Sequence, residues 1–148
     1  MSLRAIPLIL FVFIFYNVVV LIGGSGDATT TAAGVVHNPT DTLLRQVLLT
    51  VPMLNGNPWP FSWGDLIVLL LFGTLFVELL KATYTSGTSL LDHGLSMLVF
   101  VVCLIEFLMV RQAQTSVFFF IVIATLIDVI AGYTIGIRVA RRDLAIGG

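Results

Sequence analysis

Four long apolar segments, separated by polar or glycine-rich stretches, dominate the pattern of the chain. They cover about residues 5–22, 63–82, 89–110 and 117–139. At about 1.5 Å of helix per residue, each could cross most or all of a hydrocarbon core roughly 30 Å thick. The pattern therefore predicts an all-α fold, an integral membrane bundle of four transmembrane helices within a single membrane domain, 1–148.

A long polar stretch, residues 23–62, separates the first two apolar segments. Its opening glycines end the first helix, because glycine leaves the backbone flexible and exposed. Within it, apolar residues at helical spacing predict a short amphipathic helix over 41–51, capped by Thr40 or Asp41. We expect the stretch to be one long extracytoplasmic loop.

Two serines stand three residues before an aspartate at the start of an apolar run. These pairs are Ser62 with Asp65, and Ser89 with Asp92. In a capping box the two side chains bind each other's backbone N–H groups and so fix the first turn of a helix. The pairs predict the starts of the second and third helices.

The composition agrees with a membrane protein. Of 148 residues, 58% are hydrophobic and 10% charged, and the mean hydropathy is +1.09. These values exclude a water-soluble core, which typically has about 45 to 50% apolar residues. A net charge of −1 with seven basic residues argues against nucleic-acid binding.

Metal and haem sites are not expected. The single cysteine, Cys103, cannot form an intramolecular disulfide or a cysteine-rich metal site. His93 falls in an apolar segment, but His37 lies in the loop, so a bis-histidine site within the membrane is excluded. We expect no cofactor.

The first apolar segment has the general outline of a signal peptide, with one basic residue ahead of it and small residues at 31–34. Its apolar run of residues 5–22 is longer than the roughly 7 to 15 residues of a usual signal-peptide core. Cleavage remains an alternative, and we expect a retained helix.

The basic residues predict the orientation, because Lys and Arg beside the spans stay on the cytoplasmic side. Trp59 and Trp63 fall where an aromatic belt marks the outer interface. We therefore predict a multi-pass protein of the bacterial inner (plasma) membrane with both termini in the cytoplasm. The basic residues then placed inside, several of them able to reach lipid headgroups, are Arg4, Lys81, Arg138, Arg141 and Arg142, whereas Arg45 and Arg111 lie outside.

Polar side chains inside the apolar segments are the best functional candidates, because a charged group at a helix centre costs about 2.5 to 3.5 kcal/mol on insertion scales. On the third helix, Ser96, Cys103 and Glu106 share one face with Asp92 at about 100° per residue, so this face is predicted to look inward. We call the predicted intramembrane set the polar seam: Asp128, Glu106, Glu78, Thr74, Ser96 and Asn17.

Asp128 lies on the face of the fourth helix that also carries Gly132 and Gly136, a G-x-x-x-G spacing that permits close helix packing. Three interpretations stay open. It is a neutral acid that hydrogen-bonds Thr74, Ser96 or a backbone carbonyl, or a step of a proton or cation relay between Glu106 and Glu78, or a contact with a partner helix or lipid.

Two of the acids have a base within reach on their own helix or just beyond it. Glu78 stands one turn from Lys81, and Glu106 precedes Arg111. We predict that both are ion pairs near the membrane boundaries, with the long basic side chains extending toward headgroups or water.

The half of the chain from about residue 61 to 143 resembles small four-helix inner-membrane proteins of proteobacteria, which carry no assigned function. The matching phrases are LFVELLKAT, HGLSMLVFVVCLIEFL and DVIAGYTIGIRVARRD. The resemblance implies a membrane bundle and no particular activity.

These observations predict an accessory or scaffolding subunit of a larger bacterial inner-membrane complex, with no chemistry of its own. Its partners would be membrane lipids and other membrane subunits, or further copies of itself. The alternative function is a proton or cation pathway through the seam. We do not expect an enzyme, because no nucleophile with its base, paired acid and base, or metal-ligand spacing occurs.

Overall fold

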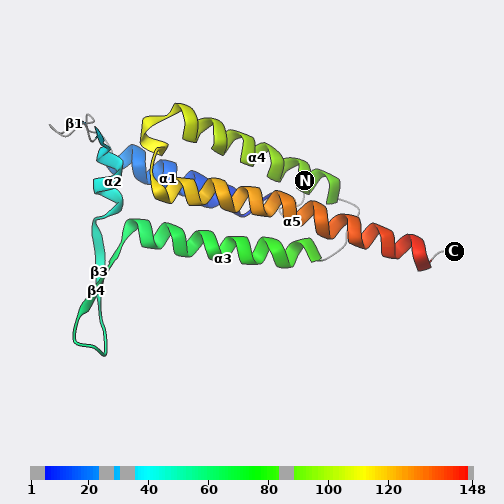
Figure 1. Cartoon of the computed structure of the whole chain (residues 1–148), viewed down its shortest axis with the longest axis horizontal. Helices are drawn as coiled ribbons and strands as arrows, with labels where there is room; N and C mark the ends of the chain where they lie inside the picture. The colour runs from blue at the N-terminus through cyan, green and yellow to red at the C-terminus, as the bar shows by residue number, and fades with distance from the viewer. Residues whose placement is uncertain (1–5, 24–28, 31–35, 84–88, 147–148) are drawn as a thin grey trace.

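The structure, a computed structural model, describes the backbone of residues 6–23, 29–30, 36–83 and 89–146, and the side chains of residues 6–23, 38–83 and 94–138. The described chain is mostly helical, as predicted. Its long helices are α1 (Ile9–Gly23), α3 (Trp63–Thr83), α4 (Ser89–Met109) and α5 (Ser116–Ile146) (Figure 1).

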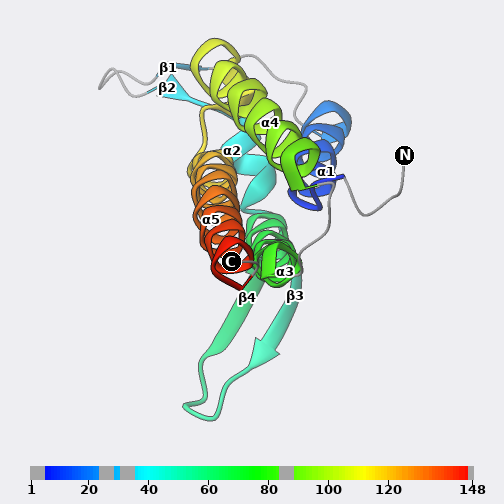
Figure 2. The same ribbon diagram turned by 90° about the vertical axis from the view of Figure 1, so that its right-hand side faces the viewer.

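These helices lie side by side with α5 in contact with each of the others. α5 packs against α3 and α4 along their length and also touches α1, while α1 packs on α3. Seen end-on, α4 lies on the opposite side of the bundle from α3 (Figure 2). The end of α1, the start of α3, the end of α4 and the start of α5 meet at one end of the bundle (Figure 1).

Two of the helical segments are long and apolar enough to cross a membrane: Trp63–Thr83 and Ser116–Arg138. Ile9–Gly23 and the segment Gly94–Met109 are apolar but shorter. The predicted second and third helices are confirmed within one residue at each end.

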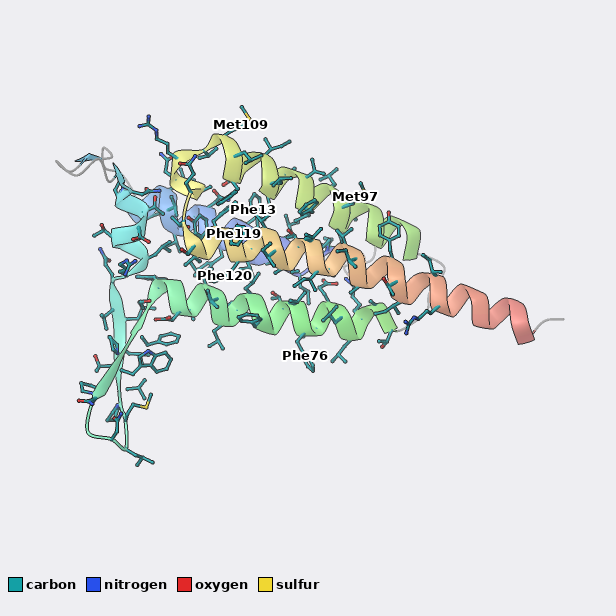
Figure 3. The ribbon with its side chains drawn as sticks, in the orientation of Figure 1. Phe13, Phe76, Met97, Met109, Phe119 and Phe120 are labelled. Carbon is teal, nitrogen blue, oxygen red and sulfur yellow. The ribbon has the colours of Figure 1, made fainter. Side chains whose placement is uncertain are left out.

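Apolar side chains fill the interior and also cover the outside. Ile67 and Leu71 of α3 and Phe118 and Ile121 of α5 are buried in one apolar cluster. Large apolar residues also point outward, and Figure 3 shows Phe76 directed away from the bundle below α3 and Met109 directed away above α4. Phe76 is 62% exposed. Such a surface suits lipid rather than water.

The predicted capping box at the start of α3 is confirmed. The Ser62 N–H donates to Asp65 Oδ2 at 2.8 Å, and the Asp65 N–H donates to Ser62 Oγ at 3.3 Å. The Ser62 hydroxyl also donates to Asp65 Oδ2. The side chains of Ser89 and Asp92 lie outside the described part of the chain.

The predicted fourth helix is too short. α5 has 31 residues and continues to Ile146, past the predicted end near residue 139. The added segment, Ala-Arg-Arg-Asp-Leu-Ala-Ile, contains strong helix formers and no glycine or proline, so charge alone does not stop the helix. The extension projects beyond the end of α3 and the start of α4 (Figure 1).

The predicted first helix starts too early. α1 begins at Ile9 after a turn in which the Leu10 N–H donates to the Pro7 carbonyl at 3.1 Å. Proline disfavours helical geometry in the residue before it, and this places the boundary near Pro7. The predicted start, residue 5, lies outside the described residues.

The amphipathic helix predicted over 41–51 is wrong in its second half. A short helix, α2 (Pro39–Leu44), is followed by strand β3 (Val47–Pro52), which pairs antiparallel with β4 (Pro58–Ser62). A run of five mostly apolar residues fits either a helix or a strand, and here pairing across a tight turn decides for the strand. A second pair of very short strands, β1 (Thr29–Thr30) and β2 (Val36–His37), precedes α2.

Asn38 caps the start of α2 and binds the connection between α4 and α5. Asn38, rather than the predicted Thr40 or Asp41, caps α2 by accepting from the Thr40 N–H at 3.1 Å, and its amide donates to the Arg111 carbonyl at 2.7 Å. Asn38 thereby ties the loop to the α4–α5 connection, which includes a short 3-10 turn (Arg111–Ala113).

In the turn of the β3–β4 hairpin, Gly56 has a φ of 80°, which glycine adopts without steric cost.

Gly64 lies where α3 meets α2 and α5 most closely. A Cβ there would stand 3.2 Å from Val117 Cγ2 and 3.3 Å from the Leu44 carbonyl oxygen, whereas a Cβ at Gly73 would meet nothing within 4 Å. We expect Gly64→Leu to lower the midpoint of thermal unfolding in detergent by the equivalent of about 1 to 3 kcal/mol of overpacking. Gly73→Leu is the matched control on the same helix, and an equal effect of both variants would contradict the close approach.

Candidate functional site: polar contacts between the helices

Glu78 of α3 is buried, with 4% of its surface exposed, and it holds the start of α1. The Leu8 N–H donates to Glu78 Oε1. Lys81 Nζ lies 2.9 Å from Glu78 Oε2 and donates to the Ile6 carbonyl oxygen at 3.4 Å. The predicted Glu78–Lys81 ion pair is therefore present, and it also binds both sides of the turn that opens α1.

The position of Glu78 complements the helix it touches. The first N–H groups of a helix have no partner within the helix, and its N-terminus carries a partial positive charge. A carboxylate supplied by α3 satisfies one of these N–H groups and favours the same end of the helix dipole. Glu78 thus acts as an N-terminal cap for α1 from a neighbouring helix, with Lys81 balancing its charge.

Asn17 of α1 and Glu106 of α4 form a second contact between helices. The Glu106 carboxyl lies close to the Asn17 side chain, and Asn17 Nδ2 donates to the Phe13 carbonyl at 3.1 Å. Two of the six predicted seam residues therefore meet, and they link α1 to a helix that it otherwise touches little.

The predicted ion pair between Glu106 and Arg111 is wrong. Arg111 is exposed, and in the part of the chain whose side chains are described the salt bridges join Asp41 to Arg45 and Glu78 to Lys81. α4 ends at Met109, and a 3-10 turn beginning at Arg111 follows, so the helical spacing that suggested the pair is interrupted before the arginine.

Tyr16 forms a third contact, which the sequence did not predict. Its ring is 1% exposed and packs edge-on against Phe118, with the ring centroids 4.9 Å apart. Its hydroxyl oxygen lies 2.9 Å from the Gln112 carbonyl oxygen and 2.8 Å from Thr115 Oγ1. Thr115 in turn accepts from the Phe118 N–H at 3.2 Å and so caps α5.

The hydrogen positions in this group follow from its acceptors. A carbonyl oxygen only accepts, so the single Tyr16 hydroxyl hydrogen points at the Gln112 carbonyl. Thr115 must then donate its own hydrogen to the Tyr16 oxygen while accepting from the Phe118 N–H. Each hydroxyl both donates and accepts, and the start of α5 is fixed to the middle of α1.

Asp128 and Ser96 are both buried, at 8% exposed each, on α5 and α4. Cys103 is fully buried and Glu106 partly so, which confirms that this face of α4 looks inward. Gly132, one turn beyond Asp128, is also buried, and Gly136 is half-buried. The face of α5 that carries Asp128 therefore looks inward as far as Gly132.

A hydrogen bond from Thr74 to Asp128 was one of the predicted arrangements, but the Thr74 hydroxyl donates within α3 instead. This hydroxyl points back along its own helix, toward the carbonyl oxygens of Leu70 at 2.9 Å and Leu71 at 3.0 Å. Ser and Thr side chains within helices commonly bond the preceding turn in this way. The hydroxyl therefore satisfies itself within α3.

The predicted boundary residues lie at opposite ends of the helices. Trp63 begins α3 and its ring lies 6.4 Å from that of Phe15, while Trp59 lies in the hairpin next to it. Arg138 is exposed at the other end of the apolar part of α5. Arg141 and Arg142 lie on the helical extension, and their side chains fall outside the described part of the chain.

Two of these contacts could be anticipated only in part. A tyrosine inside an apolar helix usually finds a partner for its hydroxyl, and a threonine just before an apolar run commonly caps a helix. Neither rule says that Tyr16 and Thr115 meet. The pairing of Lys81 with Glu78 could be predicted from their spacing. The bond between Glu78 and the Leu8 N–H, 70 residues away, depends on how the helices pack.

Comparisons with known protein families, with curated proteins and with solved structures found no match. Among the described residues, no three His, Cys, Asp or Glu side chains come together as a metal site. The resemblance to small proteobacterial membrane proteins stays a prediction.

Proposed function

We propose that this protein is an accessory or scaffolding subunit of a larger bacterial inner-membrane complex, without chemistry of its own. It crosses the bilayer four times and keeps both termini in the cytoplasm. The observation that carries the proposal is the use of its polar groups between helices: Glu78 and Tyr16, both buried, bind neighbouring helical segments, and Glu106 lies beside Asn17.

The arrangement of the helices supports four crossings. Successive long helices run in opposite directions, so that α2 and the hairpin gather at one end and the start of α1 and the end of α3 lie toward the other (Figure 1). At about 1.5 Å per residue the 15 residues of α1 span about 22 Å, less than a typical core. Glu78 and Lys81 compensate for the short length of α1. They bind backbone groups of Leu8 and Ile6, which lie just before the first residue of α1 and beside the last turns of α3.

The polar contacts support a structural role over a pathway. A relay through Glu106, Asp128 and Glu78 requires carboxyl groups that can exchange protons or cations with neighbours along the membrane normal. Glu78 is instead held by a backbone N–H and a lysine, and Glu106 lies beside Asn17. Such contacts favour a fixed geometry, in which a small bundle presents a constant surface to other subunits.

Copurification tests the proposal. The protein, tagged at its C-terminus and expressed at its native level, would be extracted with a mild detergent and its partners identified by mass spectrometry and native gels. We expect comigration with a stoichiometric set of larger membrane subunits. A homo-oligomer without partners would contradict the accessory role.

Proton and cation flux in liposomes separates the alternative. We expect no flux above that of empty vesicles for the purified wild-type protein, and therefore no loss with Asp128→Asn or with Glu106→Gln. Flux that is present in the wild type and abolished by Asp128→Asn, with unchanged folding by circular dichroism, would establish a pathway instead.

A further inference from the structure

The β3–β4 hairpin has one strongly apolar face. Residues paired across an antiparallel sheet share a face, and successive residues of a strand alternate between faces. The pairs are Leu49 with Phe61, Thr50 with Pro60, Val51 with Trp59, and Pro52 with Pro58. One face therefore carries Leu49, Val51, Trp59 and Phe61, and the other carries Thr50, Pro52, Pro58 and Pro60. The ring centroids of Trp59 and Phe61 lie 5.6 Å apart, as expected for neighbours on one face.

The hairpin projects sideways from the bundle. It leaves at the start of α3, runs crosswise to the helices, and extends beyond α3 on the side away from α4; both views agree (Figures 1 and 2). Met53 and Leu54 near its tip are exposed. If the helices cross a bilayer, this direction lies along the membrane surface and not into the water above it.

We propose that the apolar face of the hairpin rests on the outer surface of the bilayer, at the boundary between headgroups and acyl chains, beside α3. This inference rests on the proposed membrane insertion. We expect lipid to cover this face, because α3, which follows the hairpin directly in the chain, also exposes apolar side chains at Leu69, Phe72 and Phe76. The hairpin continues that surface around the end of the helix.

The charge pattern fits the same occupant. The chain has no charged residue between Arg45 and Asp65, an interval that includes the whole hairpin. Placing it at the interface therefore requires no charged group to lose water. Tryptophan prefers this depth, since its ring is apolar and its N–H can reach water or headgroups.

The prolines disfavour a β-strand as the occupant. Within the described part of the chain, β3 and β4 pair only with each other, so each has an outer edge that could in principle add a strand from another chain. Pro52, Pro58 and Pro60 have no N–H to donate, and proline is tolerated in edge strands where the missing donor would face outward. The edges thus lack donors that strand addition would use, and the apolar face remains the surface available for binding.

Depth-dependent quenching of tryptophan tests the proposal. Trp63→Phe leaves Trp59 as the only tryptophan of the full-length protein, which would be reconstituted into phosphatidylcholine–phosphatidylglycerol vesicles. We expect Trp59 to lose emission when the lipids are brominated near the headgroup end of their acyl chains, and to be protected from acrylamide. Strong acrylamide quenching without quenching by the brominated lipid would overturn the proposal.

A pair of adjacent substitutions provides the matched comparison. Val51→Asp places a carboxylate on the apolar face, and Thr50→Asp places one on the opposite face, both in the Trp63→Phe background. We expect Val51→Asp to increase acrylamide quenching of Trp59 and to reduce quenching by lipid, and Thr50→Asp to change neither. Equal effects of the two would contradict a lipid-facing side.

Two controls separate this inference from other outcomes. In a chain with Trp59→Phe, Trp63→Phe and Phe72→Trp, the new tryptophan reports on α3. If deeply brominated lipid fails to quench it, membrane insertion itself is wrong; if it is quenched while Trp59 is not, only the hairpin inference fails. Nanodiscs that hold one copy test for a partner copy, since loss of Trp59 protection there would assign the face to a second chain.

Discussion

Replacing Glu78 with alanine is expected to lower the free energy of unfolding by about 3 to 5 kcal/mol, as for a buried ion pair that loses one partner. The Lys81 ammonium and the Leu8 N–H would both lose the carboxylate that binds them. The measurement is unfolding in mixed micelles by titration with sodium dodecyl sulfate, followed by circular dichroism.

The exposed ion pair of α2 is the control for Glu78. The side chains of Arg45 and Asp41 are 78% and 36% exposed, and Arg45→Ala should change the free energy of unfolding by less than about 1 kcal/mol. Glu78→Gln keeps an acceptor for the Leu8 N–H and should fall between the wild type and Glu78→Ala. A cost for Glu78→Ala no larger than that of Arg45→Ala would show that the cap does not hold α1.

Tyr16→Ala is expected to cost about 3 to 5 kcal/mol, since it removes a fully buried ring from the contact with Phe118. Tyr16→Phe keeps the ring and removes only the hydroxyl. It should cost about 1 to 3 kcal/mol, because the Gln112 carbonyl loses its donor. The same titration in mixed micelles measures both variants.

A double-mutant cycle tests whether Tyr16 and Thr115 act together. The effects of Tyr16→Phe and Thr115→Ala should not add, with a coupling of about 0.5 to 3 kcal/mol. Thr134, whose hydroxyl bonds the Ile130 carbonyl of its own helix, supplies the control, and Thr134→Ala should be additive with Tyr16→Phe. Additivity in both cycles would refute the hydrogen-bonded group.

The helices were the most predictable part of the fold. The length of each long apolar run predicts the length of its helix, and the capping box of Ser62 and Asp65 correctly predicted Trp63 as the first residue of α3. Ends without such signals were predicted less well. α1 started later because of Pro7, and α5 continued because its charged segment is also a good helix former.

The hairpin was missed because its signal is divided between two places. The run Val47–Val51 reads as one turn and a half of an apolar helix when it is considered alone. The Asn-Gly-Asn turn and the second run at 58–62 indicate a hairpin only when both strands are read together.

The candidate site was predictable by residue type and not by partner. Burial of Glu78, Ser96 and Asp128 follows from placing polar groups on inward faces. Which atom each one binds depends on how far one helix slides along another, and spacing within a single helix cannot give that. Glu106 illustrates this, since Arg111 follows it in the chain, whereas Asn17 of another helix lies beside it.

The length of α5 has a mechanical consequence. Its 31 residues make a rod about 46 Å long, about 16 Å longer than the hydrocarbon core of a typical bilayer, which is roughly 30 Å thick. A rod that pivots within the packed bundle moves its free end farther than any point inside the bundle. A tilt of about 10° displaces one end of a rod of that length by about 8 Å relative to the other end. A small rearrangement among the packed helices would thus be converted into a much larger displacement of the arginine-bearing tip of α5.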